Sequence, residues 1–446
     1  MKLQEPINQN YAATIVKLEH IIDLAGCDRI KGALIFGNQV IISKDAQVGD
    51  EGIFFPVECQ LDHEFVSNNN LYRKPELGNI DTTKVGYFEN NRRIKCAKFR
   101  GHKSEGMWLP LNSLWYLTPG NKSDANLLIT DLRSGDTFDY IGTHKICEKY
   151  IPKSSNVGGV NKGKKASLIN SIVDGQWRFH FDTENLRKNI HKIYPHDIIS
   201  ISDKFHGTSL IAGKPLILRN LNWFEKLLRK VGVKIQESVY GLTYSSRKMI
   251  KAVNGVDKSN GLHYYSSDIW GIIAKEIEDR IPNGFTVYGE AVGYTPEGSF
   301  IQGGYNYGFD PKEHALFVYR VVSTNNEGKT LELSWPQLQE FCFTRALAPV
   351  KELFYGKAYD LVPFVEGTDI RDWHNDFLKY LEDRWVHDQD CEYNPGMPAE
   401  GIVVRRDSLV ECESWKLKNF RFNERESKEL DKGTIDIETE ESNDTE

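Results

Sequence analysis

Short runs of β-branched and aromatic residues, each closed by glycine, asparagine or aspartate, follow one another between residues 11 and 118. Runs of this length and spacing are typical of strands, and they show little helical periodicity. A chain of such strands buries its apolar faces by closing its sheet or by packing two sheets together. We therefore expect a small β-barrel or sandwich in an amino-terminal module of residues 1–118.

The rest of the chain is long enough for a second domain. Its 446 residues exceed the ~250 to 300 residues of a usual single core. Residues 119–173 change character and include a stretch rich in Gly, Ser and Lys at 153–167, which predicts a linker. The second domain is expected to span residues 174–427 and to begin with a helix capped by Asp182 or Thr183.

The negative charge of the chain is concentrated at its end. The formal net charge is −7, and residues 434–446 carry six carboxylates and no base, so removing them leaves −1. Such a composition predicts a disordered tail over residues 428–446. The alternative is that this tail mimics the charge of a nucleic acid and competes for a basic groove. The nearly neutral body leaves a nucleic-acid partner possible.

A basic segment lies near the end of the amino-terminal module. Its basic residues alternate with apolar ones, as they would on a half-buried edge strand with a solvated basic face. A surface that contacts nucleic acid explains the pattern equally well, and both interpretations stay open. The basic residues are Arg92, Arg93, Lys95, Lys98, Arg100, His102 and Lys103.

Several other classes of protein are not indicated. No apolar run approaches the ~18 to 20 residues of a membrane helix, so no membrane partner is expected. The amino terminus lacks the apolar stretch of a secretory signal, and the seven cysteines include no C-x-x-C pair. We expect a cytoplasmic protein, in the host cytoplasm if it is viral, without a structural zinc.

The sequence KFHGTS, which begins at Lys204, follows a predicted strand at 198–203. Lys-x-x-Gly also occurs at Lys98, Lys103 and Lys258, so the spacing alone selects nothing. Lys204 differs because it ends a strand and precedes four further segments in a fixed order. These are FTVYGEAVG (285–293), LFVYRV (316–321), AEGIVVRR (399–406) and SWKLKN (414–419).

The last of these segments places two lysines on one side of a strand. Alternate strand residues point the same way, so Lys416 and Lys418 would face a site while Trp415 and Leu417 pack behind them. A lysine that attacks a phosphate must be a neutral amine, and neighbouring cations lower its pKa. Two solvated lysines on a surface strand are the alternative.

Carboxylates, aromatic residues and an arginine complete the pattern. Glu400 precedes a predicted buried strand and is the first choice for a carboxylate that binds Mg²⁺. Glu290 lies at the end of the predicted strand 285–288 and could accept from a ribose hydroxyl or hold a metal-bound water. Phe317 and Tyr319 share one strand face, where either ring can stack on a purine or pack in the core. Arg247 could bind a phosphate with two hydrogen bonds, and the alternative is an exposed arginine on the surface without such a role.

The five segments, in this order, resemble the covalent nucleotidyltransferase superfamily of RNA ligases, DNA ligases and mRNA capping enzymes. His206 occupies a position where DNA ligases and capping enzymes generally have aspartate. KFHGTS is similar to the RNA ligase branch typified by the Deinococcus radiodurans RNA ligase, which has an OB-like module ahead of its catalytic domain. The resemblance implies an α+β fold, with an OB-like β-barrel before an ATP-grasp-like adenylyltransferase domain of antiparallel sheets and flanking helices.

The resemblance also implies an activity, ATP-dependent RNA ligation. Lys204 would form lysyl-AMP from ATP with Mg²⁺ or Mn²⁺, and a monomer would then seal RNA ends, in particular nicks with an RNA 3′-hydroxyl strand, in RNA repair. Catalytic residues would be Lys204, Arg247, Glu290, Lys416 and Lys418. Nucleotide-binding residues would add His206, Gly207 and either Phe317 or Tyr319, and metal-binding residues would be Glu400 and Glu290.

Some residues depart from the family pattern. Arg320 stands where many ligases have aspartate, and Arg219 competes with Arg247 as the early arginine. Two other functions are therefore weighed. One is a DNA ligase or an mRNA capping-type nucleotidyltransferase, and the other is a catalytically inactive protein that binds RNA ends.

Overall fold

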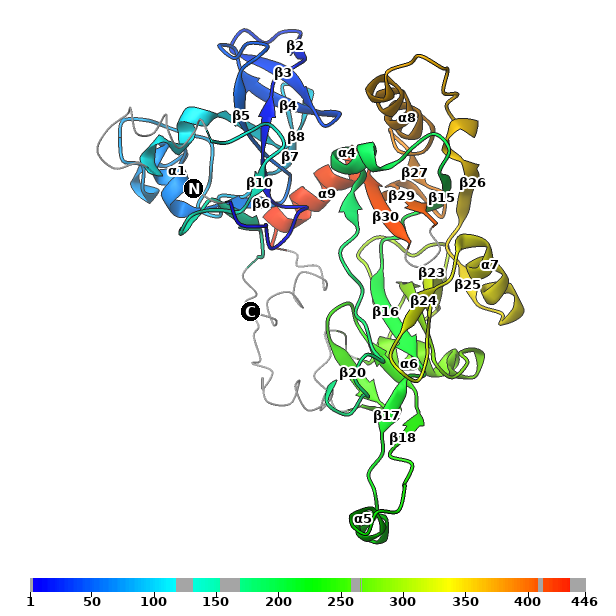
Figure 1. Cartoon of the computed structure of the whole chain (residues 1–446). Helices are drawn as coiled ribbons and strands as arrows, with labels where there is room; N and C mark the ends of the chain where they lie inside the picture. Colours follow the sequence, from blue (N-terminus) through cyan, green and yellow to red (C-terminus); the bar gives the residue numbers. More distant parts are fainter. Residues whose placement is uncertain are drawn as a thin grey trace. The chain divides into compact units, whose positions relative to one another are not determined.

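Figure 1 shows the computed structural model of the chain, which describes residues 3–117, 131–152, 169–257, 265, 267–407 and 412–433. The chain forms two compact units, one of Met1–Ile151 with Phe420–Thr434 and one that includes Pro152–Asn419. Both contain strands and helices, which confirms the expected α+β class. The predicted linker stretch 153–167 and the acidic residues 434–446 lie outside the described residues.

The first unit consists mainly of short strands. They are β1 (Ala13–Lys17), β2 (Ile21–Asp23), β3 (Ile30–Ile35), β4 (Asn38–Ser43), β5 (Glu51–Phe55), β6 (Cys59–Leu61), β7 (Cys96–Phe99), β8 (His102–Glu105), β9 (Met107–Pro110), β10 (Thr137–Phe138), β11 (Tyr140–Ile141), β12 (His144–Lys145) and β13 (Cys147–Lys149). The helices are α1 (His63–Asn68), η1 (Pro75–Leu77), η2 (Leu111–Leu117) and α9 (Phe420–Asp431).

These strands form several small sheets. One has the order β10-β1-β5-β9, another the order β2-β3-β4, and β6–β13, β7–β8 and β11–β12 are pairs. Strand β5 is buried on both faces, because Ile53 and Phe55 join one core cluster while Phe54 joins another with Trp108. Among the described residues the pairings do not close a barrel, so the predicted barrel is not confirmed.

Helix α9 is held in the first unit by a buried arginine. The Arg93 guanidinium donates to Glu58 Oε1 at 2.9 Å and to Asp431 Oδ1 at 2.6 Å, and Arg93 is only 1% exposed. Lys95 pairs with the other Asp431 oxygen. A buried guanidinium requires such partners. The basic segment that begins at Arg92 is therefore not one solvated face, because part of it fixes α9.

The second unit contains two larger sheets. Their strands are β14 (Glu184–Asn185), β15 (Ile198–Asp203), β16 (Thr208–Gly213), β19 (Thr243–Ser245), β20 (Ile250–Val253), β21 (Val256–Asp257), β22 (Phe285–Gly293), β23 (His314–Thr324), β24 (Thr330–Glu332), β25 (Ala348–Pro349), β26 (Glu352–Lys357), β29 (Gly401–Arg406) and β30 (Glu413–Lys418). Two strand pairs lie apart, β17 (Leu216–Leu218) with β18 (Ser238–Tyr240) and β27 (Asp390–Cys391) with β28 (Asn394–Pro398).

The sheets are largely antiparallel. The smaller has the order β14-β30-β29-β15-β26 and the larger the order β21-β20-β19-β16-β22-β23-β24, with β25 beside β23. The flanking helices are α4 (Leu186–Asn189), α5 (Trp223–Lys230), α6 (Ile269–Glu276), α7 (Trp335–Thr344) and α8 (Ile370–Trp385), with short turns η3 (Ile190–Lys192), η4 (Glu278–Arg280) and η5 (Ala358–Asp360). None of the described helices is long and apolar enough to cross a membrane.

One face of the smaller sheet is covered by α8. Ile201 of β15 and Trp415 and Leu417 of β30 share a core cluster with Trp373 and Phe377 of that helix. Because strand residues alternate, the residues between them point to the opposite face. That opposite face carries the polar side chains of the candidate site.

Candidate active site

The segment from Lys204 to Gly207 joins the two sheets of the second unit. Strand β15 of the smaller sheet ends at Asp203, and strand β16 of the larger sheet begins at Thr208. Four residues therefore cross from one sheet to the other. A side chain on this crossing can reach groups that either sheet presents.

Three hydrogen bonds fix this crossing. They run from Lys204 N to Gly401 O at 3.0 Å, from His206 N to Tyr307 Oη at 2.6 Å, and from Gly207 N to Glu290 Oε1 at 3.0 Å. Their acceptors lie on β29, in a loop and on β22, so both sheets hold the backbone. Glu290, predicted to contact nucleotide, thus also positions the crossing itself.

Glu400 gathers the predicted cations around one carboxylate. Its Oε1 accepts from Lys204 Nζ at 2.8 Å and from Lys418 Nζ at 3.1 Å, and His206 Nδ1 lies 3.9 Å from Oε2. The Glu400 side chain is 3% exposed, whereas that of Lys204 is 26% exposed. The carboxylate therefore lies at the bottom of the site, and the lysine amine is reachable from solvent.

The charge of Glu400 is set by its neighbours. Burial raises the pKa of its carboxyl, but the charges of Lys204, Lys418 and His206 outweigh burial and lower the pKa to about 2. The carboxylate therefore stays ionised at any working pH. It can hold cations, but it is too weak a base to take a proton from a lysine.

Lys416 is surrounded by other basic side chains. Burial, together with the charges of Lys418, Lys204 and Arg247, lowers the pKa of its ammonium to about 7, although Asp182 opposes the shift. The lowered pKa of Lys416 therefore indicates that its ammonium lies close to three other basic side chains, those of Lys418, Lys204 and Arg247. Such a cluster has the charge needed to bind a phosphate group.

Replacing Lys416 with methionine is expected to stabilise the free protein. Between the lowered pKa of about 7 and the ordinary value of 10.5 the unfolded chain binds the extra proton, so this group destabilises the fold increasingly as the pH falls through that range. At pH 7 the gain should be about 1 kcal/mol or more, roughly 2–4 °C in melting temperature. Calorimetry at several pH values measures it.

The difference in melting temperature should narrow as the pH rises toward 10. Lys379→Met is the matched control, because Lys379 is an exposed lysine on α8. Two results would contradict the burial of the Lys416 ammonium and its repulsion by neighbouring cations. One is a Lys416→Met protein that melts at a lower temperature than the unmodified protein at pH 7, and the other is a difference in melting temperature that does not change with pH.

The two candidate aromatic residues on β23 have different environments. The Phe317 ring stacks on Phe205 of the crossing, with centroids 4.4 Å apart and an angle of 11°. The Tyr319 hydroxyl lies 3.2 Å from Ser209 Oγ, and its ring contacts the edge of His180. The β22–β23 register skips Tyr319 between the Val318 and Arg320 pairs. Both side chains nevertheless lie on one face of the sheet, as expected, because Glu290 pairs with Phe317 on one side and with Ser209 on the other.

Arg247 lies in the turn after β19 and pairs with Asp182. Its charge also lowers the pKa of Lys416, so it belongs to the cation cluster. The competing Arg219 pairs instead with Glu225 at 2.5 Å. Asp182 was expected to cap a helix, but α4 starts at Leu186 and its cap is Asn185. That expectation is wrong, because β14 pairs with β30 before the helix begins.

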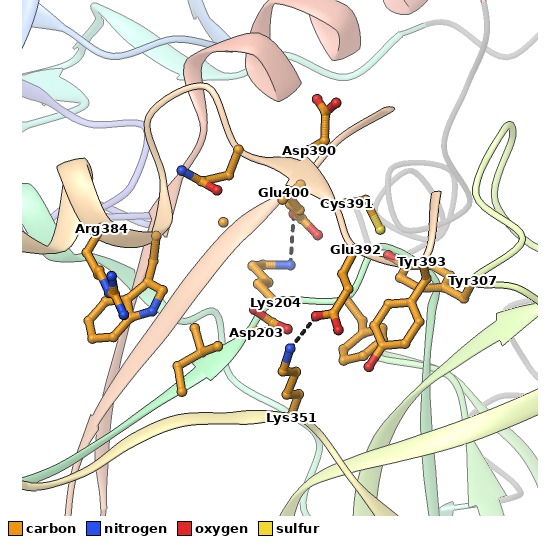
Figure 2. A pocket seen from close by; sticks show the side chains of 16 residues that line it. Asp203, Lys204, Tyr307, Lys351, Arg384, Asp390, Cys391, Glu392, Tyr393 and Glu400 are labelled. Carbon is orange, nitrogen blue, oxygen red and sulfur yellow. Dashed lines mark hydrogen bonds and ion pairs between the residues drawn. The ribbon is translucent and has the colours of Figure 1, made fainter. Parts of the chain in front are cut away.

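A cavity of about 350 Å³ opens beside Lys204 and Glu400 (Figure 2). Figure 2 shows Tyr307 and Tyr393 on one side of the two residues and Arg384 on the other, with Lys351 pointing toward Glu392. The Asp203 carboxyl also lines it, and burial raises its pKa to about 6 despite the opposing charge of Lys351. The cavity offers both aromatic and charged groups to a ligand.

The residues present fit a divalent cation that is held mainly by a substrate. Glu400 Oε2 is buried and accepts no hydrogen bond in the structure. Within the described residues no group of three or more His, Cys, Asp or Glu side chains could hold a metal. Mg²⁺ commonly binds through one or two carboxylates together with phosphate oxygens and water. Glu400 can be such a carboxylate.

Comparisons with known proteins agree with this arrangement. Residues 200–421 match the family model described as RNA ligase. The match spans the crossing, the strands that carry Glu290 and Phe317, and the strand with Lys416 and Lys418. This segment is therefore similar to the RNA ligase family.

Solved RNA ligase structures from Naegleria gruberi share the fold. A variant with AMP and manganese has a TM-score of 0.55 and 16% identity, and covers 93% of this chain and 98% of its own. A variant without ligand has 0.54 and 15%, with the same coverage. A variant with ATP and manganese has 0.52 and 16%, with 94% and 99% covered. A comparison with curated proteins found no match.

Proposed function

We propose that this chain is an ATP-dependent RNA ligase that joins a 3′-hydroxyl RNA end to a 5′-phosphate end. The observation that carries the proposal is the position of Lys204, which crosses between two sheets with its amine 2.8 Å from the buried Glu400 carboxylate. Lys418 shares that carboxylate, so a nucleophile, an anion and a phosphate-binding cation meet at one point. The match to RNA ligases supports the choice of substrate.

In the first step the neutral Lys204 amine attacks the α-phosphorus of ATP. A nitrogen–phosphorus bond forms, the bond to the β-phosphate oxygen breaks, and pyrophosphate leaves. Glu400 orients the amine, and Lys416 and Lys418 stabilise the charge on the α-phosphate. A bound Mg²⁺ or Mn²⁺ would neutralise phosphate charge and compete with Lys204 for Glu400.

Two transfers complete the reaction. A 5′-phosphate oxygen of the RNA attacks the phosphorus of lysyl-AMP, which releases Lys204 and leaves AMP joined to the RNA. The 3′-hydroxyl of the other end then loses its proton to solvent water and attacks the phosphorus of the activated 5′-phosphate. A phosphodiester forms and AMP leaves. Arg247, close to Lys416, is suited to hold one of these phosphates.

Other proposed roles follow the family pattern. His206, Gly207 and Glu290 hold the crossing and contact the nucleotide, and Phe317 or Tyr319 stacks on adenine. The first unit would act as an OB-like module in an enzyme of the Deinococcus type. We propose sealing of nicks in RNA repair by a cytoplasmic monomer with Mg²⁺ or Mn²⁺.

Incubation with ATP labelled in the α-phosphate and with Mg²⁺ or Mn²⁺ tests the proposal. The full chain should become covalently labelled, and Lys204→Ala should not. Absence of the label would favour the inactive RNA-end-binding protein. Labelling by GTP would favour a capping-type enzyme, and sealing that does not require RNA at the 3′-hydroxyl side of a nick would favour a DNA ligase.

Gly207→Ala is expected to slow this labelling about a hundredfold, because a displacement near 1 Å at a reacting group has a cost of that size. A Cβ atom at this position would lie 2.2 Å from Ala291 O, so the crossing must shift. Gly303→Ala is the control, since its Cβ would meet nothing within 4 Å. Equal labelling rates in the two variants would show that the crossing tolerates displacement.

A further inference from the structure

Helix α5 stands at the tip of the β17–β18 pair, away from the sheets of the second unit (Figure 1). At the base of this pair Ile217 is 2% exposed and belongs to a core cluster. The helix itself has no buried residue. A capping box between Asn222 and Glu225 forms its first turn. Local hydrogen bonds therefore stabilise the first turn of the helix. Packing within the protein does not explain why the helix contains apolar residues.

One side of α5 is apolar and exposed. Trp223 is 77% exposed, Phe224 51%, Leu227 50% and Val231, just after the helix, 69%. Residues three and four apart lie on the same helix side, so these four form one continuous apolar face. Val233 extends it and is also exposed. Isolated exposed apolar residues are ordinary, but a face of this kind indicates a binding surface.

The rest of the protrusion is basic. Between residues 219 and 237 there are five basic residues and two acidic ones, which gives +3 in a chain of net charge −7. Both acids are already paired, Glu225 with Arg219 and Glu237 with Arg229. Lys226 and Lys230 lie along one edge of the apolar face, beside Trp223, and are exposed. The charge therefore selects an anionic partner.

The size and chemistry of this surface distinguish the possible partners. An eight-residue helix is about 12 Å long and ~10 Å wide. That footprint is far below the ~800 Å² that each partner of a standard protein interface buries. RNA would meet the cations and could stack on the aromatic rings, but it would leave the aliphatic side chains in water. A lipid surface accepts the apolar face and attracts the cations at the same time.

We propose that α5 binds the surface of a membrane that contains anionic lipids. The helix would lie in the interface, with Trp223, Phe224 and Leu227 among the acyl chains and Lys226 and Lys230 at the headgroups. This binding is peripheral and involves no spanning segment. It would hold the second unit at a membrane without using any residue of the candidate active site.

Flotation of the full chain with vesicles tests this. Vesicles of phosphatidylcholine with phosphatidylserine should carry the protein upward, vesicles of phosphatidylcholine alone should carry much less, and high salt should release it. The triple variant W223S/F224S/L227S should lose more than about tenfold in vesicle affinity. The control is Phe343→Ser, a substitution at a residue of α7 that is 87% exposed, and it should bind normally.

Labelling by ATP reports folding, because none of these residues lies in the candidate site. The triple variant should label as the unmodified chain does, and K226E/K230E should lose vesicle binding in the same way. No flotation, or flotation unchanged in the triple variant, would overturn the proposal. A chain that does not bind vesicles, and whose triple variant loses RNA binding or self-association, would also overturn the proposal. The apolar face would then contact RNA or a second copy of the chain.

Discussion

Glu400→Gln is expected to lower the rate of lysyl-AMP formation about 10²- to 10³-fold, the usual effect of removing one preorganised charged group. The buried carboxylate orients the Lys204 amine at 2.8 Å and also holds Lys418 at 3.1 Å, so its charge positions both cations. Glutamine keeps the shape and removes the charge. Single-turnover labelling with ATP measures the rate.

Glu392→Gln is the matched control for that variant. Glu392 lines the same cavity and pairs with Lys351, but its side chain is 61% exposed. Its loss should change the labelling rate little, since exposed ion pairs contribute about 1 kcal/mol or less. Equal losses in both variants, or a normal rate for Glu400→Gln, would refute the central position of Glu400.

The pKa of the Glu400 carboxyl, lowered to about 2, also predicts that its titration does not produce an acid limb of the pH–rate profile near neutral pH.

Lys418→Met is expected to reduce both lysyl-AMP formation and its transfer to RNA by about 10²-fold, because one ammonium that would meet the phosphate is removed. Single-turnover labelling with ATP and a chase with RNA measure the two rates.

Lys418→Arg separates charge from shape in that experiment. If charge alone matters, arginine should restore most of the rate of both steps. Lys329→Met is the control for a lysine outside the site, since the Lys329 side chain is 78% exposed. Unchanged rates in Lys418→Met would show that the Lys418 ammonium does not stabilise the phosphate.

Strand alternation made part of the site predictable. The placement of Trp415 and Leu417 in the core, with Lys416 and Lys418 on the other face, follows from a period of two residues in an unbroken strand. The same period places Phe317 and Tyr319 on one face of β23, and both side chains do lie on the face of Ser209 although the register skips Tyr319. The one-residue irregularity itself has no signal in the segment LFVYRV.

Contacts between distant residues were not predictable. Asp182 and Arg247 pair across 65 positions, and the polar residues around Asp182 equally suit a helix cap. Helix α9 follows β30 directly, yet Arg93 holds it in the first unit through Asp431. Such ion pairs depend on which surfaces meet after folding, and local sequence patterns carry no information about that.

The central claim is that Lys204 alone carries the nucleotide, and peptide mass spectrometry after incubation with ATP and Mg²⁺ tests it most directly. The account predicts AMP on the peptide that contains Lys204, attached to its side-chain nitrogen. It predicts none on Lys98, Lys103 or Lys258, which share the Lys-x-x-Gly spacing. AMP on one of those lysines, or no adduct in a protein that still binds ATP, would contradict it.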